Sequence, residues 1–171
     1  KEIANSFSIK VDEAIPDNDP IFFHGNGNIG IVEDIIREGA LLTQKDRGYI
    51  ISFSSYMICV TPKNNIQESL RIAGSGTEYS KPYGALFVIS PPEEEFKAFE
   101  STIKSSSGLC CIHSTNFRED PDKLVAIITT NENIDRLKKV AKEKGIDENK
   151  ITDHDSFIEM YKQKNTIVSR K

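Results

Sequence analysis

Short apolar runs alternate with segments of helical periodicity, and this limits the chain to a fold that mixes strands with helices. The clearest run is Tyr83 to Ser90, which ends at Pro91-Pro92 because proline cannot continue a strand ladder. Ile21 to His24 is a second short buried strand, closed by Gly25. Leu124 to Thr129 is the last clear strand. The pattern predicts an α+β fold with short strands split into small sheets and flanking helices.

Helical spacing and capping residues organise the segments between these runs. Asn26 or Asn28 can cap a first helix that Gly39 ends, so the first unit is strand, turn and helix, with His24 at the carboxyl end of the strand. Residues 1–20 alternate weakly and end in a loop rich in proline and Asx residues. The other predicted helices are 66–73, 93–103, 134–144 (capped by Asn131-Glu132-Asn133) and 153–162, and the other predicted strands are 49–54 and 109–113.

The length and net charge of the chain exclude some classes of function. The chain has 171 residues, which is enough for one domain with a proper core and too few for two ordinary ones. The formal net charge is -4, so non-specific binding to nucleic acid is not favoured. No apolar stretch is long enough to cross a bilayer. We therefore expect a single domain that binds neither nucleic acid nor membrane.

The cysteines are Cys59, Cys110 and Cys111. An odd number that includes one adjacent pair does not indicate a disulfide framework. All three have apolar neighbours in the sequence, which predicts buried free thiols. This favours a protein that works in a reducing compartment such as the cytoplasm.

Polar residues at or near predicted strands are the candidates for a site. They are His24 with Gly25, the pair of serines in Ser52-Phe53-Ser54, and the acids around Asp120-Pro121-Asp122. Taken singly, each has an ordinary structural interpretation: a hydrogen-bonded histidine, a common strand dipeptide pattern, and a turn. Their order and their strand context favour one shared cleft.

In this order the chain resembles the ADP-ribosyltransferase superfamily over roughly residues 20–137. Members carry Arg or His on the first core strand, Ser-x-Ser or Tyr on the second, and Glu at the start of a late strand. His24-Gly25 is similar to the His-Gly of the diphtheria-toxin and poly(ADP-ribose) polymerase branches. Ser52-Phe53-Ser54, which follows Gly48-Tyr49, is similar to the Ser-Thr-Ser of the cholera- and pertussis-toxin branch. The run 85–91 resembles the strand after the helix in cholera toxin, and the run 124–134 resembles its closing strand and the turn that follows.

The resemblance implies a set of site residues and a co-substrate, NAD. The implied catalytic residues are His24, Ser52 and one of Asp122, Asp120 and Glu119. The implied NAD-binding residues are His24, Gly25, Tyr49, Ser52, Ser54 and Tyr56. The chain departs from the family at the third position, where Glu-x-Glu or a single Glu is expected. It has Arg118-Glu119-Asp120-Pro121-Asp122 there, and a shorter Asp changes the reach by about one methylene.

The implied activity is a glycosyl transfer in which the nicotinamide–ribose bond of NAD breaks and ADP-ribose passes to a protein. A carboxylate lowers the barrier by stabilising the oxocarbenium-like ribose. The resemblance implies a bacterial toxin or effector that acts on a host protein in the host cytosol, with dependence on a protein activator left open. Within the single domain 1–171, residues 1–20 would be a lead-in, 21–137 the ADP-ribosyltransferase-like core, and 138–171 the C-terminal helices.

Two alternatives belong to other functional classes. The missing Glu favours a degenerate transferase fold that serves as a protein-binding module. An RNA 2′-phosphotransferase-like enzyme would use His24-Gly25 and Arg47, but Tyr49 and Ile51 stand where that family has histidines.

Three other clusters have more ordinary explanations. Cys110 or Cys111 with His113 could supply a thiol nucleophile and its base, but burial is the expected role of these cysteines. The segment Asp153-His154-Asp155, with His113, could bind a metal, but it is typical of a helix start. Residues 93–95 are all Glu and fit a solvated first helical turn, with a displaced catalytic acid cluster as the alternative.

Overall fold

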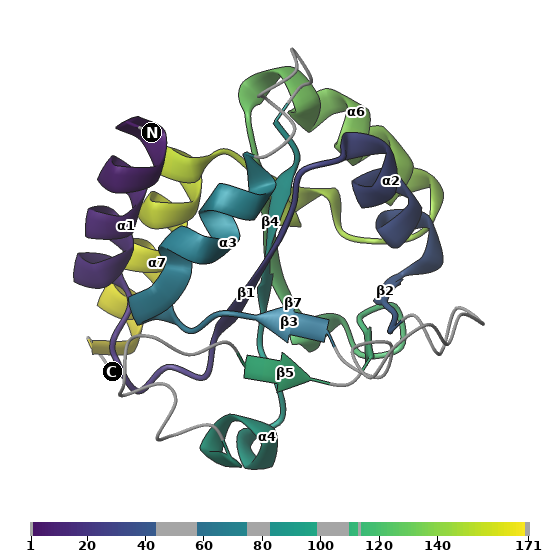
Figure 1. The fold of residues 1–171 in the computed structure, drawn as a ribbon. Coiled ribbons are helices and arrows are strands. Elements are labelled where there is room, and N and C mark those ends of the chain that lie inside the picture. Colours follow the sequence, from purple (N-terminus) through teal and green to yellow (C-terminus); the bar gives the residue numbers. More distant parts are fainter. Residues whose placement is uncertain (1, 44–57, 75–82, 99–109, 113, 170–171) are drawn as a thin grey trace.

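The structure is a computed structural model that describes residues 2–43, 58–74, 83–98, 110–112 and 114–169 (Figure 1). These residues form a single α+β domain. The described α-helices are α1 (Glu2–Ala14), α2 (Ile29–Glu38), α3 (Ile66–Ala73), α4 (Glu93–Ala98), α6 (Asn131–Glu143) and α7 (His154–Ser169). The described strands are β1 (Phe22–Asn26), β2 (Ala40–Leu41), β3 (Ile58–Val60), β4 (Ala85–Ile89), β5 (Cys110–Ile112), β6 (Thr115–Asn116), β7 (Leu124–Thr129) and β8 (Ile151–Thr152). Short 3-10 helices are η2 (Lys63–Asn65), η4 (Pro121–Lys123) and η5 (Glu148–Lys150).

A mixed four-stranded sheet with the order β1-β4-β7-β8 forms the centre of the domain. β4 pairs antiparallel with both β1 and β7, and β7 pairs parallel with β8 after a connection through α6. All five residues of β4 are buried, because helices cover both faces of the sheet. This explains why Tyr83 to Ser90 is apolar nearly throughout instead of alternating.

Consecutive strand residues project to opposite faces of this sheet, and each face has its own core. Phe22 and Phe87 lie in the core under α2 and α6. Phe23 and Leu86 lie in the core under α1, α3 and α7. Figure 1 shows the two helix groups on opposite sides of β1, β4 and β7.

The small β3–β5 pair is attached to the central sheet through β1. Phe23 and Thr61 exchange two backbone hydrogen bonds of 2.8 Å each, and this bridge sets β3 beside β1. β5 then pairs antiparallel with β3. The other two-stranded sheet joins β2 to β6. The described strands are therefore divided between one central sheet and two small ones, as the sequence pattern predicted.

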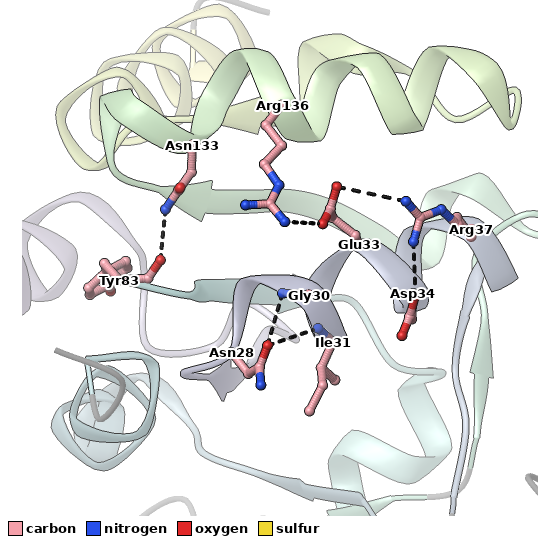
Figure 2. Close-up of polar contacts among 9 residues, drawn as sticks. All are labelled: Asn28, Gly30, Ile31, Glu33, Asp34, Arg37, Tyr83, Asn133 and Arg136. Atoms are coloured by element: carbon pink, nitrogen blue, oxygen red, sulfur yellow. Dashed lines mark hydrogen bonds and ion pairs between the residues drawn. The ribbon is translucent and has the colours of Figure 1, made fainter. Parts of the chain in front are cut away.

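Polar contacts hold α2 in place and join it to α6 (Figure 2). Asn28 caps the helix: its Oδ1 accepts hydrogen bonds from the backbone amides of Gly30 at 2.9 Å and Ile31 at 3.3 Å. Glu33 on α2 accepts a 2.5 Å hydrogen bond from Arg136 on α6. The Glu33 side chain is only 12% exposed, and the Arg136 contact is the main cause that lowers its pKa.

Several sequence predictions are confirmed by the element bounds. α2 begins after Asn28 and ends at Gly39, whose φ of 71° is left-handed, as glycine allows. The helix predicted at 66–73 is α3, and the strand predicted at 124–129 is β7. Phe157, Ile158 and Tyr161 of α7 are buried, and so are Leu137 and Val140 of α6.

Other predictions are wrong. Residues 2–14 form the helix α1, whereas the weak alternation in this stretch predicted no helix. Asn131-Glu132-Asn133 is the first turn of α6, which is preceded by Thr130 at the cap position. Cys59 is exposed and not buried, because Ile58 and Val60 on either side of it take the inward positions of β3. None of the helices in the described ranges is long and apolar enough to span a membrane.

Candidate functional site

His24 is the third residue of β1, directly opposite Phe87 of β4. The sequence placed it at the carboxyl end of the strand, and this is wrong. Gly25 and Asn26 continue the ladder opposite Leu86 and Ala85. The prediction failed because a glycine normally weakens a strand, whereas here the pairing with β4 holds Gly25 in it. His24 therefore lies within the sheet and not in a turn beyond it.

The His24 imidazole is oriented by the backbone of β3. Its Nδ1 lies 2.8 Å from the carbonyl oxygen of Cys59, and since a carbonyl can only accept, Nδ1 carries the proton. Burial lowers the pKa of His24, and the hydrogen bond to Cys59 opposes that shift in part. The ring is thus neutral near pH 7, with Nε2 as a hydrogen-bond acceptor. The Phe87 ring packs beside it with a centroid distance of 6.2 Å.

Gly25 has a packing role on the opposite face of the sheet. A Cβ atom at this position would lie 2.0 Å from the carbonyl oxygen of Ser69 in α3. Gly84, which precedes β4, is equally constrained, because its Cβ would lie 1.8 Å from the carbonyl oxygen of Asn26. The glycine after His24 therefore lets α3 approach the sheet, which is a structural reason for the His-Gly pair.

The three candidate acids lie at the end of the sheet where β7 begins. Glu119, Asp120 and Asp122 are exposed, and Asp122 belongs to η4. The ladder makes Leu124, the first residue of β7, level with Phe22 of β1. Leu124 is thus about 10 Å across the sheet and about 7 Å along it from His24. In the described part of the chain, none of the three carboxylates forms a hydrogen bond or ion pair with His24.

Several predicted site residues fall outside the described residues. Tyr49, Ser52, Ser54 and Tyr56 lie in segment 44–57, which connects Thr43 to Ile58. Arg47 and His113 also lie outside. Their place in a site remains a prediction.

A cavity of about 920 Å³ lies near the start of β1, between α1 and α4, and His24 does not line it. Its polar centre is Lys63, which donates a 2.8 Å hydrogen bond to the carbonyl of Ile15 and forms ion pairs with Asp12 and Asp17. The ion pair with Lys63 lowers the pKa of Asp17. Phe96 of α4 contributes to the apolar wall. Sequence reasoning missed this group because its members are brought together only by the tertiary fold.

A second cavity of about 620 Å³ lies at the carboxyl ends of the parallel strands β7 and β8. His154 lines it, with its Nε2 3.3 Å from the hydroxyl of Tyr83. Burial lowers the pKa of His154 against the opposing charges of Asp153 and Asp155. Asp153 caps α7 by accepting a 2.7 Å hydrogen bond from the amide of Ser156, as expected for a helix start. The described residues contain no cluster of three or more acid, His or Cys side chains that could hold a metal ion.

Comparisons with protein-family models, with curated proteins and with solved structures find no match to this chain.

Proposed function

We propose that the chain is an NAD-dependent mono-ADP-ribosyltransferase in which His24 binds the nicotinamide riboside half of NAD. The observation that carries the proposal is the fixed, neutral His24 ring: Nδ1 is held by the Cys59 carbonyl, and Nε2 forms no hydrogen bond with another described residue. A neutral Nε2 can accept a hydrogen bond from a ribose hydroxyl or from the nicotinamide amide. This is the positioning role that cleavage of NAD requires from the first core strand.

The carboxylate of the proposed reaction comes from the loop before β7. As the nicotinamide leaves, positive charge develops on the ribose, and a carboxylate beside it lowers the barrier. β1 and β7 run parallel with β4 between them, so the start of β1 and the segment of Glu119, Asp120 and Asp122 lie at the same end of the sheet, and His24 is two residues further along β1. All of β4 is buried, so the proposal requires a ligand bound at His24 to reach this loop around the end of β4 and not across its face. Asp122 is closest to the strand start and is the first choice.

In the proposal, Ser52, Ser54, Tyr49 and Tyr56 complete the NAD site from the segment that leads into β3. Gly25 contributes by its packing and not by contact with NAD, because its Cα faces α3. The acceptor is a protein, and a host protein would make the chain a secreted bacterial effector with NAD as its co-substrate. The proposal leaves dependence on a protein activator open.

The test is mass spectrometry of the intact chain and of eukaryotic lysate proteins after incubation with NAD. His24→Asn is the sharpest variant, because the Asn amide nitrogen can replace Nδ1 as donor to the Cys59 carbonyl while Nε2 is lost. We expect a fall in ADP-ribose transfer of at least about 100-fold with the fold retained. His154→Asn is the matched control for His24→Asn and should retain transfer. Asp122→Asn should lose transfer, and its matched control Glu132→Gln should retain it. Undiminished transfer by His24→Asn would overturn the proposal.

A specific observation favours a second candidate, a degenerate transferase fold that binds a protein. The exposed acids form no contact with His24 among the described residues, and they lie across one intervening strand from it. This candidate predicts no nicotinamide release from NAD and partner capture that the His24→Asn substitution leaves unchanged. Removal of phosphate from 2′-phosphorylated RNA would instead identify the RNA 2′-phosphotransferase-like activity.

A further inference from the structure

Cys59 and Cys111 are directly opposite one another in the antiparallel β3–β5 pair. Cys59 carries a free, exposed thiol, while its neighbours Ile58 and Val60 are buried. Cys110 is one position away and is opposite Val60. The register therefore separates the adjacent cysteines: Cys111 is paired with another cysteine, and Cys110 is not.

The backbone hydrogen bonds of β3 decide which kind of pair this is. Thr61 exchanges both of its backbone hydrogen bonds with Phe23, so its amide and carbonyl point toward β1. Backbone groups alternate in direction along a strand, so those of Cys59 also point toward β1, in agreement with the hydrogen bond from His24 to the Cys59 carbonyl. The amides and carbonyls of Ile58 and Val60 thus face β5. Cys59 and Cys111 are consequently a non-hydrogen-bonded pair.

Such a pair has the dimensions of a disulfide. Cα atoms in non-hydrogen-bonded antiparallel pairs are about 4.5 Å apart, the closer of the two spacings in the ladder. Disulfide-linked residues have Cα atoms about 4.4–6.8 Å apart. Residues directly opposite in an antiparallel pair also share a face of the sheet. The exposure of Cys59 means that this face is accessible to a soluble oxidant.

We propose that Cys59 and Cys111 form a site of reversible oxidation, which closes as a cross-strand disulfide in the presence of a small disulfide oxidant. One cysteine thiolate attacks glutathione disulfide, forms a mixed disulfide and releases one glutathione thiol. The second cysteine attacks the protein sulfur of this intermediate and releases the second glutathione. Two cysteine thiols are oxidised to one S–S bond, one glutathione disulfide is reduced, and the two cysteine protons pass to the two glutathione thiols.

The bond would tie β3 to β5 at the residue whose carbonyl orients His24. The oxidation chemistry does not depend on the proposed transferase activity, since it follows from the register alone. The proposal refines the expectation that the odd number of cysteines indicates no disulfide framework. Cys110 has no cysteine opposite it, whereas Cys59 and Cys111 are opposite one another.

The experiment titrates the 171-residue chain with glutathione redox buffers and then traps remaining thiols with an alkylating agent under denaturing conditions. We expect the oxidised chain to lose the mass of two hydrogen atoms and to take up one alkyl group instead of three. A peptide map should join the segments that contain Cys59 and Cys111. A thiol reductant should restore three alkylation sites.

Cys110→Ser is the matched control, because it removes a neighbouring thiol that is opposite Val60, and it should leave the disulfide intact. Cys59→Ser and Cys111→Ser should each abolish it. A peptide map that joins Cys110 to Cys59 or to Cys111 would overturn the inference. So would oxidation that stops at a stable glutathione adduct on Cys59 in the unsubstituted chain.

Discussion

His24 and Gly25 are adjacent in the sequence, but the pleat of β1 directs them to opposite faces of the sheet. His24 is held by the backbone of β3, and Gly25 leaves room for the backbone of α3. The pair therefore acts as a junction: one residue presents a hydrogen-bond acceptor, and the next lets a helix pack closely enough to hold the strand. A family-like His-Gly dipeptide can arise from both demands at once.

Gly25→Ala tests the packing half of this junction. The added methyl group would lie 2.0 Å from the Ser69 carbonyl oxygen, which is backbone and cannot rotate away. We expect the free energy of unfolding to fall by about 3 kcal/mol, at the upper end of ordinary overpacking costs. Urea denaturation measures this change.

Gly145→Ala is the control for the loss of a glycine as such. Gly145 has a φ of 74°, but nothing lies within 4 Å of a Cβ placed there. Its substitution should cost only about 1 kcal/mol, the backbone strain of a left-handed residue. If Gly25→Ala costs no more than this control, α3 does not pack on β1 as closely as described.

At the scale of elements, α2 was predictable and α1 was not. For α2, the Asn28 cap, the apolar spacing and the Gly39 terminator all indicate the same helix. In α1, Phe7, Ile9 and Val11 alternate with polar residues as in a strand. The helix leaves Ile9 62% exposed and buries Phe7 and Val11, because α1 packs against α3 and α7. Tertiary contacts decided between two local periodicities.

The sequence predicted individual residues of the candidate site but not how they are arranged in space. The sequence indicated His24 on an early strand and acids before a late one, and both statements hold. It could not indicate that β4 lies between those strands, because strand order is a long-range property that local patterns do not contain. The hydrogen bond from His24 to Cys59 was equally hidden, since it depends on how β3 docks beside β1.

The contact between α2 and α6 supports a prediction about pH. Glu33→Gln removes the charge that Arg136 and Arg37 neutralise, and at pH 7 it should lower the free energy of unfolding by about 1–2 kcal/mol. The folded-state pKa of Glu33 lies below its ordinary value of 4.5, so its contribution is present above pH 4.5 and is lost as the pH falls through the folded pKa. Urea titrations from pH 7 to 3 should show the wild-type and variant stabilities converging.

Glu143→Gln is the control for that titration, because Glu143 is exposed near the end of α6. It should change stability by less than about 0.5 kcal/mol at any pH in the range. A stability difference between Glu33→Gln and wild type that stayed constant down to pH 3 would show that the Arg136 contact does not depress the Glu33 pKa.

At the scale of the molecule, one sheet separates two apolar cores, and neither core is complete without it. Leu137 of α6 lies in one core and Phe157 of α7 in the other, and both side chains are fully buried. Leu137→Ala should cost about 2–5 kcal/mol and Phe157→Ala about 3–5 kcal/mol. Because the two side chains belong to different cores on opposite faces of the sheet, the two costs should add within about 0.5 kcal/mol in the double variant.

The same pair of substitutions tests whether the domain unfolds as one unit. β1, β4 and β7 each contribute residues to both cores, so loss of either core should release the strands that the other core needs. We expect each variant to unfold in a single transition whose midpoint is the same by circular dichroism and by tyrosine fluorescence. Two separate transitions in the Phe157→Ala variant, with the α2–α6 side melting later, would mean that the sheet does not couple its faces. The α1–α3–α7 layer would then be an independently stable unit and not half of one domain.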